Sequence, residues 1–236
     1  MIDKRFASVE AAVADVKNGS TVMVGGFGGA GMPNDLTEAL IACGTRDLTV
    51  ISNNAGTGYT GLAALLQAGR VRKIICSFPR LSDSYVYNEL YRAGKIEVEL
   101  IPQGTLAERI RAAGAGIGGF FTPTGYGTIL AEGKETRRIN GRDYVLEYPL
   151  HADVALIKAR AADRWGNLVY RKAARNFGAV MAMAARCTIA QVDEIVELGE
   201  LDPETIVTPS IFVQRVVKVP VVVKACEAGD RTQPTA

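Results

Sequence analysis

The chain has 236 residues, 48% of them hydrophobic, which is enough for one large α/β domain with a substantial core. Its formal net charge of +2 gives no electrostatic case for binding nucleic acid or an anionic membrane surface. No apolar run approaches the roughly 18 residues of a membrane span, and the charged N-terminus lacks the apolar stretch of a signal peptide.

Alternating strand and helix patterns occupy the first half of the chain. Short β-branched apolar runs predict strands, and amphipathic segments that end at glycine predict helices. We expect strands at residues 21–24, 47–52, 71–77 and 96–101, and helices at 9–16, 34–43, 61–68, 82–93 and 106–113. This alternation with short connections predicts an α/β fold: a single open, mostly parallel twisted sheet with helices on both faces.

The second half of the chain is less regular. Residues 114–127 are glycine-rich with interspersed aromatics, which is typical of a functional loop, and residues 132–143 predict a solvated hairpin that turns at Asn140-Gly141. We expect further strands at 154–159, 168–170, 188–192 and 211–217, a turn at 163–167, and a helical or buried segment at 181–185. Pro220 indicates an edge strand or an extended tail, so one domain should span residues 1–226, with a disordered tail at 227–236.

A glycine-rich stretch follows the first long strand, Thr21 to Val24. Its residues are Gly25, Gly26, Phe27, Gly28, Gly29, Ala30 and Gly31. The glycines permit a tight turn and leave room for a ligand to approach the main chain, and Pro33 suits the first turn of a helix. Free backbone N–H groups and the helix dipole would make this place an anion or oxyanion site.

Three other interpretations of the glycine stretch have to be weighed. Residues 26–31 satisfy the dinucleotide pattern G-x-G-x-x-G, but the second strand ends in Asn53-Asn54 rather than in the acid that would hold a ribose. No Gly-Lys-Ser/Thr follows, which argues against a phosphate loop of nucleotide triphosphatases. A simple tight turn is the remaining alternative, although five glycines in seven residues exceed what one turn needs.

The chain resembles the A (alpha) subunits of family I coenzyme A transferases. The resemblance begins with Asn18-Gly19 and the signature that runs through Gly25-Gly26-Phe27 to Pro33, and it covers roughly residues 1–217. It continues in the segments Ser52–Gly56, Pro102–Arg109, Thr122–Thr128 and Arg171–Phe177. The resemblance implies the open α/β sheet of the CoA-transferase and NagB/RpiA-like proteins.

This resemblance also implies a reaction and a partner. Family members move coenzyme A from an acyl-CoA to a free carboxylic acid through a glutamyl-CoA thioester, which is formed on a glutamate of the B subunit. The Ser-Glu-Asn-Gly-like motif of that glutamate is absent here, and Glu108, Glu132 and Glu147 have ordinary sequence contexts, with Glu108 placed to pair with the adjacent Arg109. We therefore expect half of a cytoplasmic enzyme, completed by a B subunit in a heterodimer or an A2B2 heterotetramer. A coenzyme A thioester would be its substrate, without a covalently bound cofactor.

Gln103 and Asn53 are the expected supporting catalytic residues, because the resemblance places these amides near the reacting thioester. Each follows a predicted strand, where open α/β sheets bind their ligands. The alternatives are a loop-capping glutamine and an ordinary Asn-Asn turn. The resemblance assigns the coenzyme A-binding, oxyanion-type loop to residues 25–31.

Several other residues have a structural and a functional interpretation. Tyr126 either walls the pocket or belongs to a packed surface loop. Arg171 and Arg175 either meet coenzyme A phosphates or a dicarboxylate, or form a solvated face or a B-subunit contact, which we favour. His151 is expected to be a structural histidine. One histidine and four scattered cysteines predict no metal site, and the thiols should be buried and reduced.

The expected donor is succinyl-CoA and the expected acceptor is 3-oxoadipate, because the resemblance is nearest to family members that use this acid. Acetoacetate is the alternative acceptor. An oxidoreductase that binds a dinucleotide is disfavoured by Asn53-Asn54, and a non-catalytic ligand-binding module is the third possibility.

Overall fold

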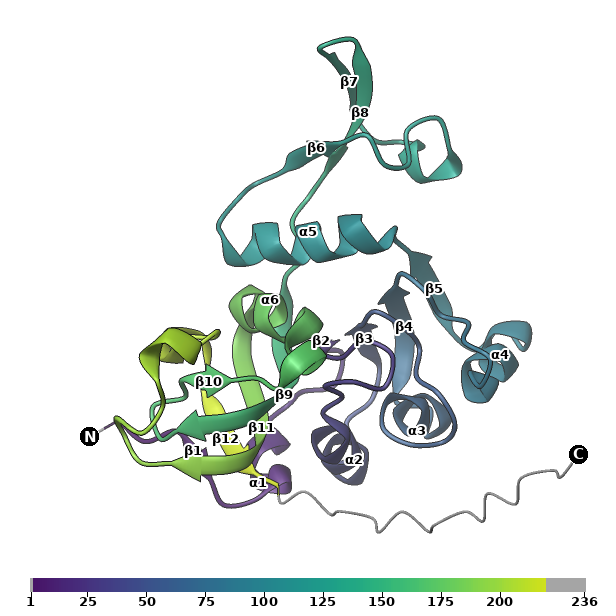
Figure 1. Ribbon diagram of the computed structural model, residues 1–236. Coiled ribbons are helices and arrows are strands. Elements are labelled where there is room, and N and C mark those ends of the chain that lie inside the picture. Colours follow the sequence, from purple (N-terminus) through teal and green to yellow (C-terminus); the bar gives the residue numbers. More distant parts are fainter. Residues whose placement is uncertain (1, 220–236) are drawn as a thin grey trace, which may run out of the picture.

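The computed structural model describes residues 2–219 of the chain (Figure 1). The predictions for Pro220 and for the tail at 227–236 lie outside the described residues. Within residues 2–219 a nine-stranded main sheet forms the centre of the molecule. Its order is β1 (Arg5–Phe6), β12 (Arg215–Lys218), β11 (Ala185–Val196), β9 (Ala152–Asp163), β2 (Thr21–Val24), β3 (Leu48–Ile51), β4 (Val71–Cys76) and β5 (Glu97–Leu100), and β10 (Leu168–Val169) pairs antiparallel with β9.

All neighbours along that order pair in parallel, and helices cover both faces of the sheet (Figure 1). On one face lie α1 (Val9–Val13), α2 (Asn34–Ala42), α3 (Leu62–Gln67) and α4 (Tyr85–Arg92), and on the other lie α5 (Gln103–Gly114) and α6 (Asn176–Ala184). The predicted single open, mostly parallel sheet with helices on both faces is confirmed for this main sheet.

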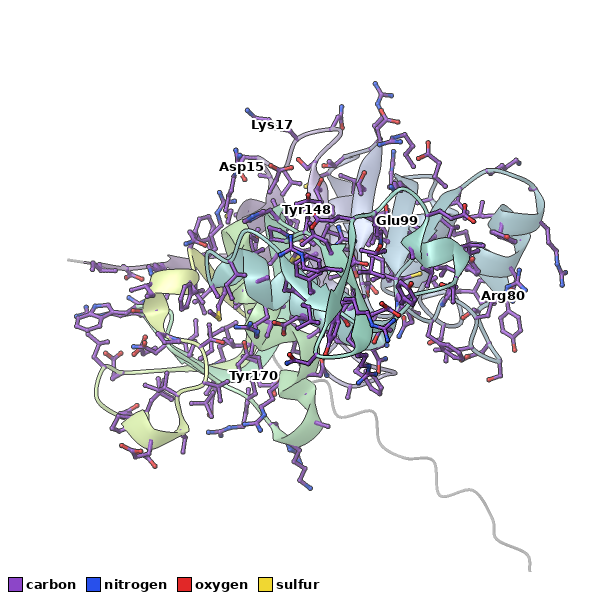
Figure 2. All side chains as sticks on the ribbon, turned by 90° about the horizontal axis from the view of Figure 1, so that it is seen from above. Asp15, Lys17, Arg80, Glu99, Tyr148 and Tyr170 are labelled. Carbon is purple, nitrogen blue, oxygen red and sulfur yellow. The ribbon has the colours of Figure 1, made fainter. Side chains whose placement is uncertain are left out.

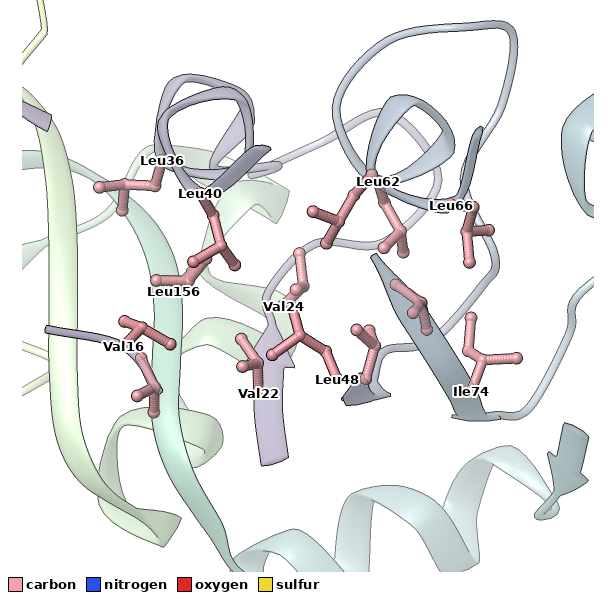
Figure 3. Close-up of a cluster of buried hydrophobic side chains, with 14 of the residues drawn as sticks. Val16, Val22, Val24, Leu36, Leu40, Leu48, Leu62, Leu66, Ile74 and Leu156 are labelled. Carbon is pink, nitrogen blue, oxygen red and sulfur yellow. The ribbon is translucent and has the colours of Figure 1, made fainter. Parts of the chain in front are cut away.

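The alternation of side chains along β2 shows how both faces of the sheet are buried. Val22 and Val24 belong to the core under α1 to α4, and Met23 between them belongs to the core under α5 and α6. Figure 3 shows the leucines of α2 and α3 lying over the apolar side chains of β2, β3 and β4. Full burial of each such leucine contributes about 1.5–3 kcal/mol to folding.

Strands β9 and β11 are much longer than predicted. Each has 12 residues, because their pairing continues beyond the apolar stretches that mark them in the sequence. Cross-strand ion pairs accompany the extension: Lys158 Nζ lies 3.5 Å from Asp193, and an Arg160 nitrogen lies 2.9 Å from Glu194. Paired charges facing solvent carry no apolar signal, so the single-sequence pattern ends too early.

Other boundaries differ from the predictions by a few residues. Helix α5 starts at Gln103 instead of residue 106, and α6 starts at Asn176 instead of residue 181. In the strand predicted at 211–217, the first part is a 3₁₀ turn, η4 (Ser210–Phe212), and β12 starts only at Arg215. The two-residue strand β1 has no counterpart among the predicted strands.

A second, three-stranded antiparallel sheet stands above α5 (Figure 1). It contains β6 (Phe120–Thr122), β7 (Thr136–Ile139) and β8 (Arg142–Glu147). The predicted hairpin turn is confirmed, since Asn140 and Gly141 have φ of +50° and +81°, as in a two-residue β-hairpin turn. Strand β6 lies in the stretch predicted to be an irregular loop and becomes a strand by pairing with β8.

Arg109 joins α5 to this small sheet. Its guanidinium donates a hydrogen bond to the Tyr148 carbonyl oxygen (2.8 Å), and its nitrogens lie 3.7 Å from Glu99 and 3.8 Å from Glu147. Glu147 is buried and also pairs with Lys134 at 2.6 Å. The predicted surface pair between Glu108 and Arg109 is wrong, because Glu108 pairs with Arg111 one helical turn later.

Candidate functional site

The candidate site lies at the edge of the main sheet where the parallel strands β2 to β5 have their carboxyl ends. The glycine stretch follows β2, Asn53 follows β3, Ser77 follows β4 and Gln103 follows β5. Strand order changes direction beside β2, since β3, β4 and β5 lie on one side of it and β9 on the other. Ligands of open α/β sheets bind at such a switch point.

Three polar side chains converge at this edge, and we call them the amide network: Asn53, Ser77 and Gln103. Gln103 Nε2 donates to Asn53 Oδ1 at 2.7 Å, and Ser77 Oγ donates to the same oxygen at 2.8 Å. Ser77 Oγ also donates to the Asn53 carbonyl oxygen at 3.0 Å. The structure thus brings together the two predicted amides, Asn53 and Gln103, and adds Ser77. The sequence offered one signal for Ser77, its position at the end of a predicted strand.

The two hydrogen bonds to Asn53 Oδ1 fix the direction of this amide. Asn53 is only 4% exposed, whereas Gln103 is exposed. With its oxygen occupied twice, Asn53 has only Nδ2 to offer a ligand as a donor, and Gln103 retains one N–H and its carbonyl oxygen. Both amides can therefore donate to an oxyanion that forms at this edge.

The first turn of α5 adds backbone donors beside Gln103. The N-cap residue Pro102 makes no side-chain cap, and Gln103 and Gly104 are exposed. Thr105 is buried in the same turn, and its hydroxyl has no hydrogen-bond partner among residues 2–219. A helix start with free N–H groups favours negative charge, so α5 reinforces the polarity of the amide network.

The glycine stretch forms a tight hairpin. Phe27 N donates to Ala30 O and Ala30 N donates to Phe27 O, both at 3.0 Å, which places Gly28 and Gly29 at the tip. Gly28 has φ of +58°, a conformation that favours glycine at this position of the turn. Phe27 and Ala30 use their amides internally, so the exposed amides of this tip are those of Gly28 and Gly29.

A small polar cavity of about 90 Å³ lies between the hairpin tip and the loop after β3. Its walls include Gly28, Gly29, Asn54 and Gly56. Ligand pockets for whole small molecules usually measure roughly 300–1,000 Å³, so this space suits a single oxyanion or a carboxylate but not a nucleotide.

Close packing explains the glycine at position 31 of this stretch. Gly31 has φ of +73°, and a Cβ there would lie 2.4 Å from the Ala174 carbonyl oxygen. Asn176, from the same segment as Ala174, donates a hydrogen bond from Nδ2 to the Ala30 carbonyl oxygen at 3.0 Å. The end of the stretch is therefore fitted against residues 174–176.

The start of α2 is less available to a ligand than the sequence suggested. Gln191 of β11, which is 1% exposed, accepts a hydrogen bond from Leu36 N at 3.2 Å. Its Nε2 donates to Asp35 Oδ2 at 2.7 Å. A buried glutamine from a distant strand thus caps this helix, because the N-cap residue Pro33 has no side chain that could do so. The exposed amides near this place are therefore those of the hairpin tip.

The remaining candidates are dispersed. Tyr126 is 46% exposed in the turn between β6 and β7, beside the small sheet. Arg171 and Arg175 are exposed, and the segment between them forms the 3₁₀ turn η2 (Lys172–Arg175). His151 is exposed just before β9, so the prediction of a satisfied structural histidine is wrong.

Two general properties of the described chain bear on the class of site. Residues 2–219 contain no group of three or more histidine, cysteine and acidic residues that could hold a metal ion. In the same part of the chain, no helix has the length and apolar character needed to cross a membrane.

Comparisons with known proteins cover nearly all of the described chain. The family model described as coenzyme A transferase matches residues 6–219. The chain is 72% identical over 219 residues to the A subunit of 3-oxoadipate CoA-transferase from Pseudomonas putida, covering 93% of this chain and 95% of that one. It is 54% identical over 215 residues to the A subunit of succinyl-CoA:3-ketoacid coenzyme A transferase from Xanthomonas campestris, covering 91% and 88%.

A solved structure agrees in fold. An acyl-CoA transferase from E. coli O157:H7, solved as a thioester complex with CoA, superposes with a TM-score of 0.80 at 23% identity. The match covers 92% of this chain and 47% of that chain, so this protein spans about half the length of the solved one. With a family model matched along nearly all described residues, the chain belongs to the coenzyme A transferase family.

Proposed function

We propose that this chain is the A subunit of a transferase that moves coenzyme A from succinyl-CoA to 3-oxoadipate, giving 3-oxoadipyl-CoA and succinate. The observation that carries the choice of acid is the 72% identity to the Pseudomonas putida protein over 93% of the chain. The amide network at the carboxyl edge of the sheet supports acyl transfer, because it gathers oxyanion donors there.

The nucleophile of this reaction belongs to a B subunit. Of the glutamates in this chain, Glu108 pairs with Arg111 on the surface of α5, and Glu147 is buried between Lys134 and Arg109. Glu132 is exposed in the segment between β6 and β7. Within residues 2–219, none of these three candidates contacts the amide network by a hydrogen bond or an ion pair, which supports a nucleophile supplied by a partner subunit. A cytoplasmic heterodimer or A2B2 heterotetramer is the assembly we propose.

The proposed steps conserve atoms and charge. The partner's glutamate attacks the acyl carbon of succinyl-CoA, and the thiolate of coenzyme A leaves as an acyl-glutamyl anhydride forms. The thiolate then attacks the glutamyl carbonyl and releases succinate, which leaves a glutamyl-CoA thioester. The carboxylate of 3-oxoadipate repeats these two steps in reverse order. No external oxidant or reductant is required.

Each addition places negative charge on one carbonyl oxygen. The donors for that oxygen in this chain are Asn53 Nδ2, the remaining N–H of Gln103, and the exposed amides of Gly28 and Gly29. These donors are held before substrate arrives, so little reorganisation is needed as the charge develops.

Acetoacetate is the second candidate acceptor. The 54% identity to the Xanthomonas campestris protein favours it, since the name of that enzyme includes a 3-ketoacid. The two acids differ in the distal carboxylate that only 3-oxoadipate carries, so a direct comparison of rates distinguishes them.

The test is succinyl-CoA-dependent transfer with this chain alone, with a co-purified B subunit, and with each acid. We expect activity only in the pair, and a higher kcat/KM for 3-oxoadipate than for acetoacetate. A preference for acetoacetate would replace the proposed acceptor. Full activity of the chain alone would place the nucleophile here and refute the division between subunits.

A further inference from the structure

An open apolar groove of about 480 Å³ lies between α4 and the edge strand β5. Its walls come from the loop after β4, from α4 and from β5, and they include Phe78, Pro79, Arg80, Tyr87, Tyr91 and Leu100. β5 is the last strand of the main-sheet order, so among residues 2–219 no strand lies beyond it. Figure 2 shows Arg80 at the margin of the molecule, further out than Glu99 of β5. We call this feature the aromatic groove.

The aromatic groove begins at the amide network. Ser77, which donates two hydrogen bonds to Asn53, also lines the groove. Phe78 N donates to the Asn53 carbonyl oxygen at 3.0 Å, so the backbone beneath the groove is fixed to the same residue. On the other wall, Leu100 ends β5 three positions before Gln103. A partner that brings a nucleophile to the amide network therefore meets this groove directly beside it.

Three large apolar side chains of the groove are about half exposed. The exposed fractions are 56% for Phe78, 50% for Leu100 and 47% for Tyr91. Half of a large apolar side chain is on the order of 100 Å², so the three expose about 300 Å² together, which is the size of a large apolar patch on a monomer. A stable interface buries about 800 Å² on each partner around such an apolar centre. The groove has the area of that centre.

The same exposure argues against a pocket for a small molecule. Such pockets bury about 70–90% of their ligand, and walls that are half exposed do not enclose a ligand to that degree. Tyrosine, phenylalanine and arginine are the side chains enriched at the centres of protein–protein interfaces. The composition of the groove therefore matches a protein surface better than it matches a substrate.

Arg80 gives the groove a positive charge. Its guanidinium carbon lies 5.0 Å from the centroid of the Tyr91 ring, a cation–π contact. Within residues 2–219 Arg80 makes no ion pair, whereas Lys73 of the neighbouring β4 pairs with Glu99 of β5 at 2.6 Å. Arg80 therefore offers a charge that this chain does not neutralise, and the complementary partner carries a carboxylate next to an apolar segment.

We propose that the B subunit docks in the aromatic groove, with Phe78 and Tyr91 as the apolar anchors and Arg80 as the contact for an acidic side chain of that subunit. This inference rests on the proposed function, because that function leaves the site incomplete without a B subunit. Docking here brings the partner beside Ser77, from which its carboxylate can reach the amide network. A substrate pocket and self-association of this chain are the competing explanations, and the experiment separates both.

The experiment uses the complex of the full-length chains. The variants are Phe78→Ser, Tyr91→Ser, their double variant and Arg80→Glu. Ile211→Ser is the matched control, since Ile211 is 74% exposed in η4, which leads into β12 near the other end of the sheet order. Mass photometry of the diluted complex gives the Kd between the subunits without substrate. Circular dichroism checks the fold of each variant chain, and the buried Tyr87 is left intact.

We expect the double variant to raise the Kd for the B subunit about 100- to 1,000-fold, because an aromatic anchor at the centre of an interface typically contributes a factor of about 30 or more. Arg80→Glu should raise Kd about 10-fold or more, since it places like charges together. Ile211→Ser should match wild type. A wild-type Kd in the double variant would overturn the docking site, and a wild-type Kd in Arg80→Glu would overturn the acidic contact.

Kinetics and the chain alone separate the competing explanations. Where the variant complex is fully assembled, its KM for succinyl-CoA and for 3-oxoadipate should equal that of wild type. A raised KM with a wild-type Kd would make the groove a substrate pocket. A changed mass distribution of this chain alone, with unchanged binding to the B subunit, would assign the groove to self-association.

The binding measurement also distinguishes this inference from the proposed function. Because Kd is measured without substrate, weaker assembly of the double variant supports the docking site even where the wild-type complex transfers nothing to either acid. Absence of transfer by the wild-type complex would refute the proposed function alone.

Discussion

Asn53 has the most constrained side chain at the candidate site. Its Oδ1 accepts one hydrogen bond from Gln103 and one from Ser77, and the residue is almost fully buried. A buried polar group held by two donors has one orientation, and losing either donor leaves part of that oxygen unsatisfied. The loop-capping alternative for Gln103 does not describe this arrangement, because its side-chain amide donates to another side chain rather than to backbone.

Removing Gln103 tests whether the amide network takes part in the reaction. We expect Gln103→Ala to lower kcat about 10- to 1,000-fold, the range for losing an oxyanion donor, with little change in complex assembly. Ser77→Ala should lower kcat less, because Ser77 orients Asn53 rather than touching substrate, and Ser77→Thr should restore most of the loss. Steady-state kinetics of the reconstituted complex, with Ser20→Ala as a control at the opposite edge, measures both. Wild-type kcat in Gln103→Ala would assign a purely structural role.

Gly28 tests the conformation of the hairpin tip. Its φ of +58° disfavours a β-branched residue, although no atom lies within 4 Å of the position that a Cβ would occupy. We expect Gly28→Val to abolish turnover of the complex while the chain stays folded by circular dichroism. Gly69→Val is the matched control, since Gly69 has φ of +65° and equal space after α3. Unchanged turnover in Gly28→Val would reduce the stretch to a connecting turn.

At the scale of elements, α5 connects the candidate site to the small sheet. Its first residue is Gln103, and Arg109, less than two turns later, holds Tyr148 and lies near the buried Glu147. The side chain of Arg109 is only 15% exposed, in contrast to Arg111 on the same helix at 45%. The two arginines therefore provide a matched pair for measuring what the connection contributes.

We expect Arg109→Ala to lower the free energy of unfolding by about 1–3 kcal/mol, because it leaves the buried Glu147 with one cation fewer and the Tyr148 carbonyl without its donor. Arg111→Ala should leave stability unchanged within error, since exposed ion pairs contribute little. Urea unfolding of both variants measures the difference. Equal effects of the two substitutions would mean that the Arg109 contacts are as weak as a surface pair.

The stability of the whole molecule depends on alkaline pH through a buried thiol and a buried phenol hydroxyl. Burial raises the pKa of the Cys76 thiol to about 12 from 9.0 and the pKa of the Tyr170 hydroxyl to about 12 from 10.0. In the unfolded chain both groups ionise at their ordinary values, while in the folded chain they stay neutral. Their contribution to stability is therefore complete below about pH 9 and is lost as pH rises from about 9 to 12.

We expect wild-type stability to fall by up to about 3 kcal/mol between pH 9 and 11 from Cys76 alone, at about 1.4 kcal/mol for each pH unit. Cys76→Ala should be less stable than wild type at pH 8 but should lose less stability above pH 9. Cys43→Ala is the control, because the Cys43 thiol is exposed, contrary to the prediction that the thiols are buried. The measurement is the urea unfolding midpoint of each protein across this pH range. Equal decreases of the midpoint in Cys76→Ala and in wild type would contradict the role given to Cys76.

Local elements and the family could be predicted from the amino-acid sequence alone. Strands β2 to β5 and helices α2 to α5 lie where apolar runs and glycine stops placed them, because a short β-branched run or a glycine-ended amphipathic segment encodes its conformation within a few residues. The turn at Asn140-Gly141 was predictable for the same reason, since positive φ at both positions needs no distant partner. The glycine and asparagine motifs were sufficient for the family, which the matched family model confirms.

Features that depend on distant partners arise only in the folded chain. Gln103 and Asn53 are 50 positions apart, and Leu36 and its capping residue Gln191 are 155 apart, so neither contact has a local signal. Strand β6 exists because β8 pairs with it, and β9 and β11 extend because their backbone pairing continues beyond the apolar runs. Residues 171–175 are only a basic segment in the sequence and lie beside the glycine stretch because Asn176 donates a hydrogen bond to Ala30. Such contacts follow from strand register and packing, which a single-sequence pattern does not encode.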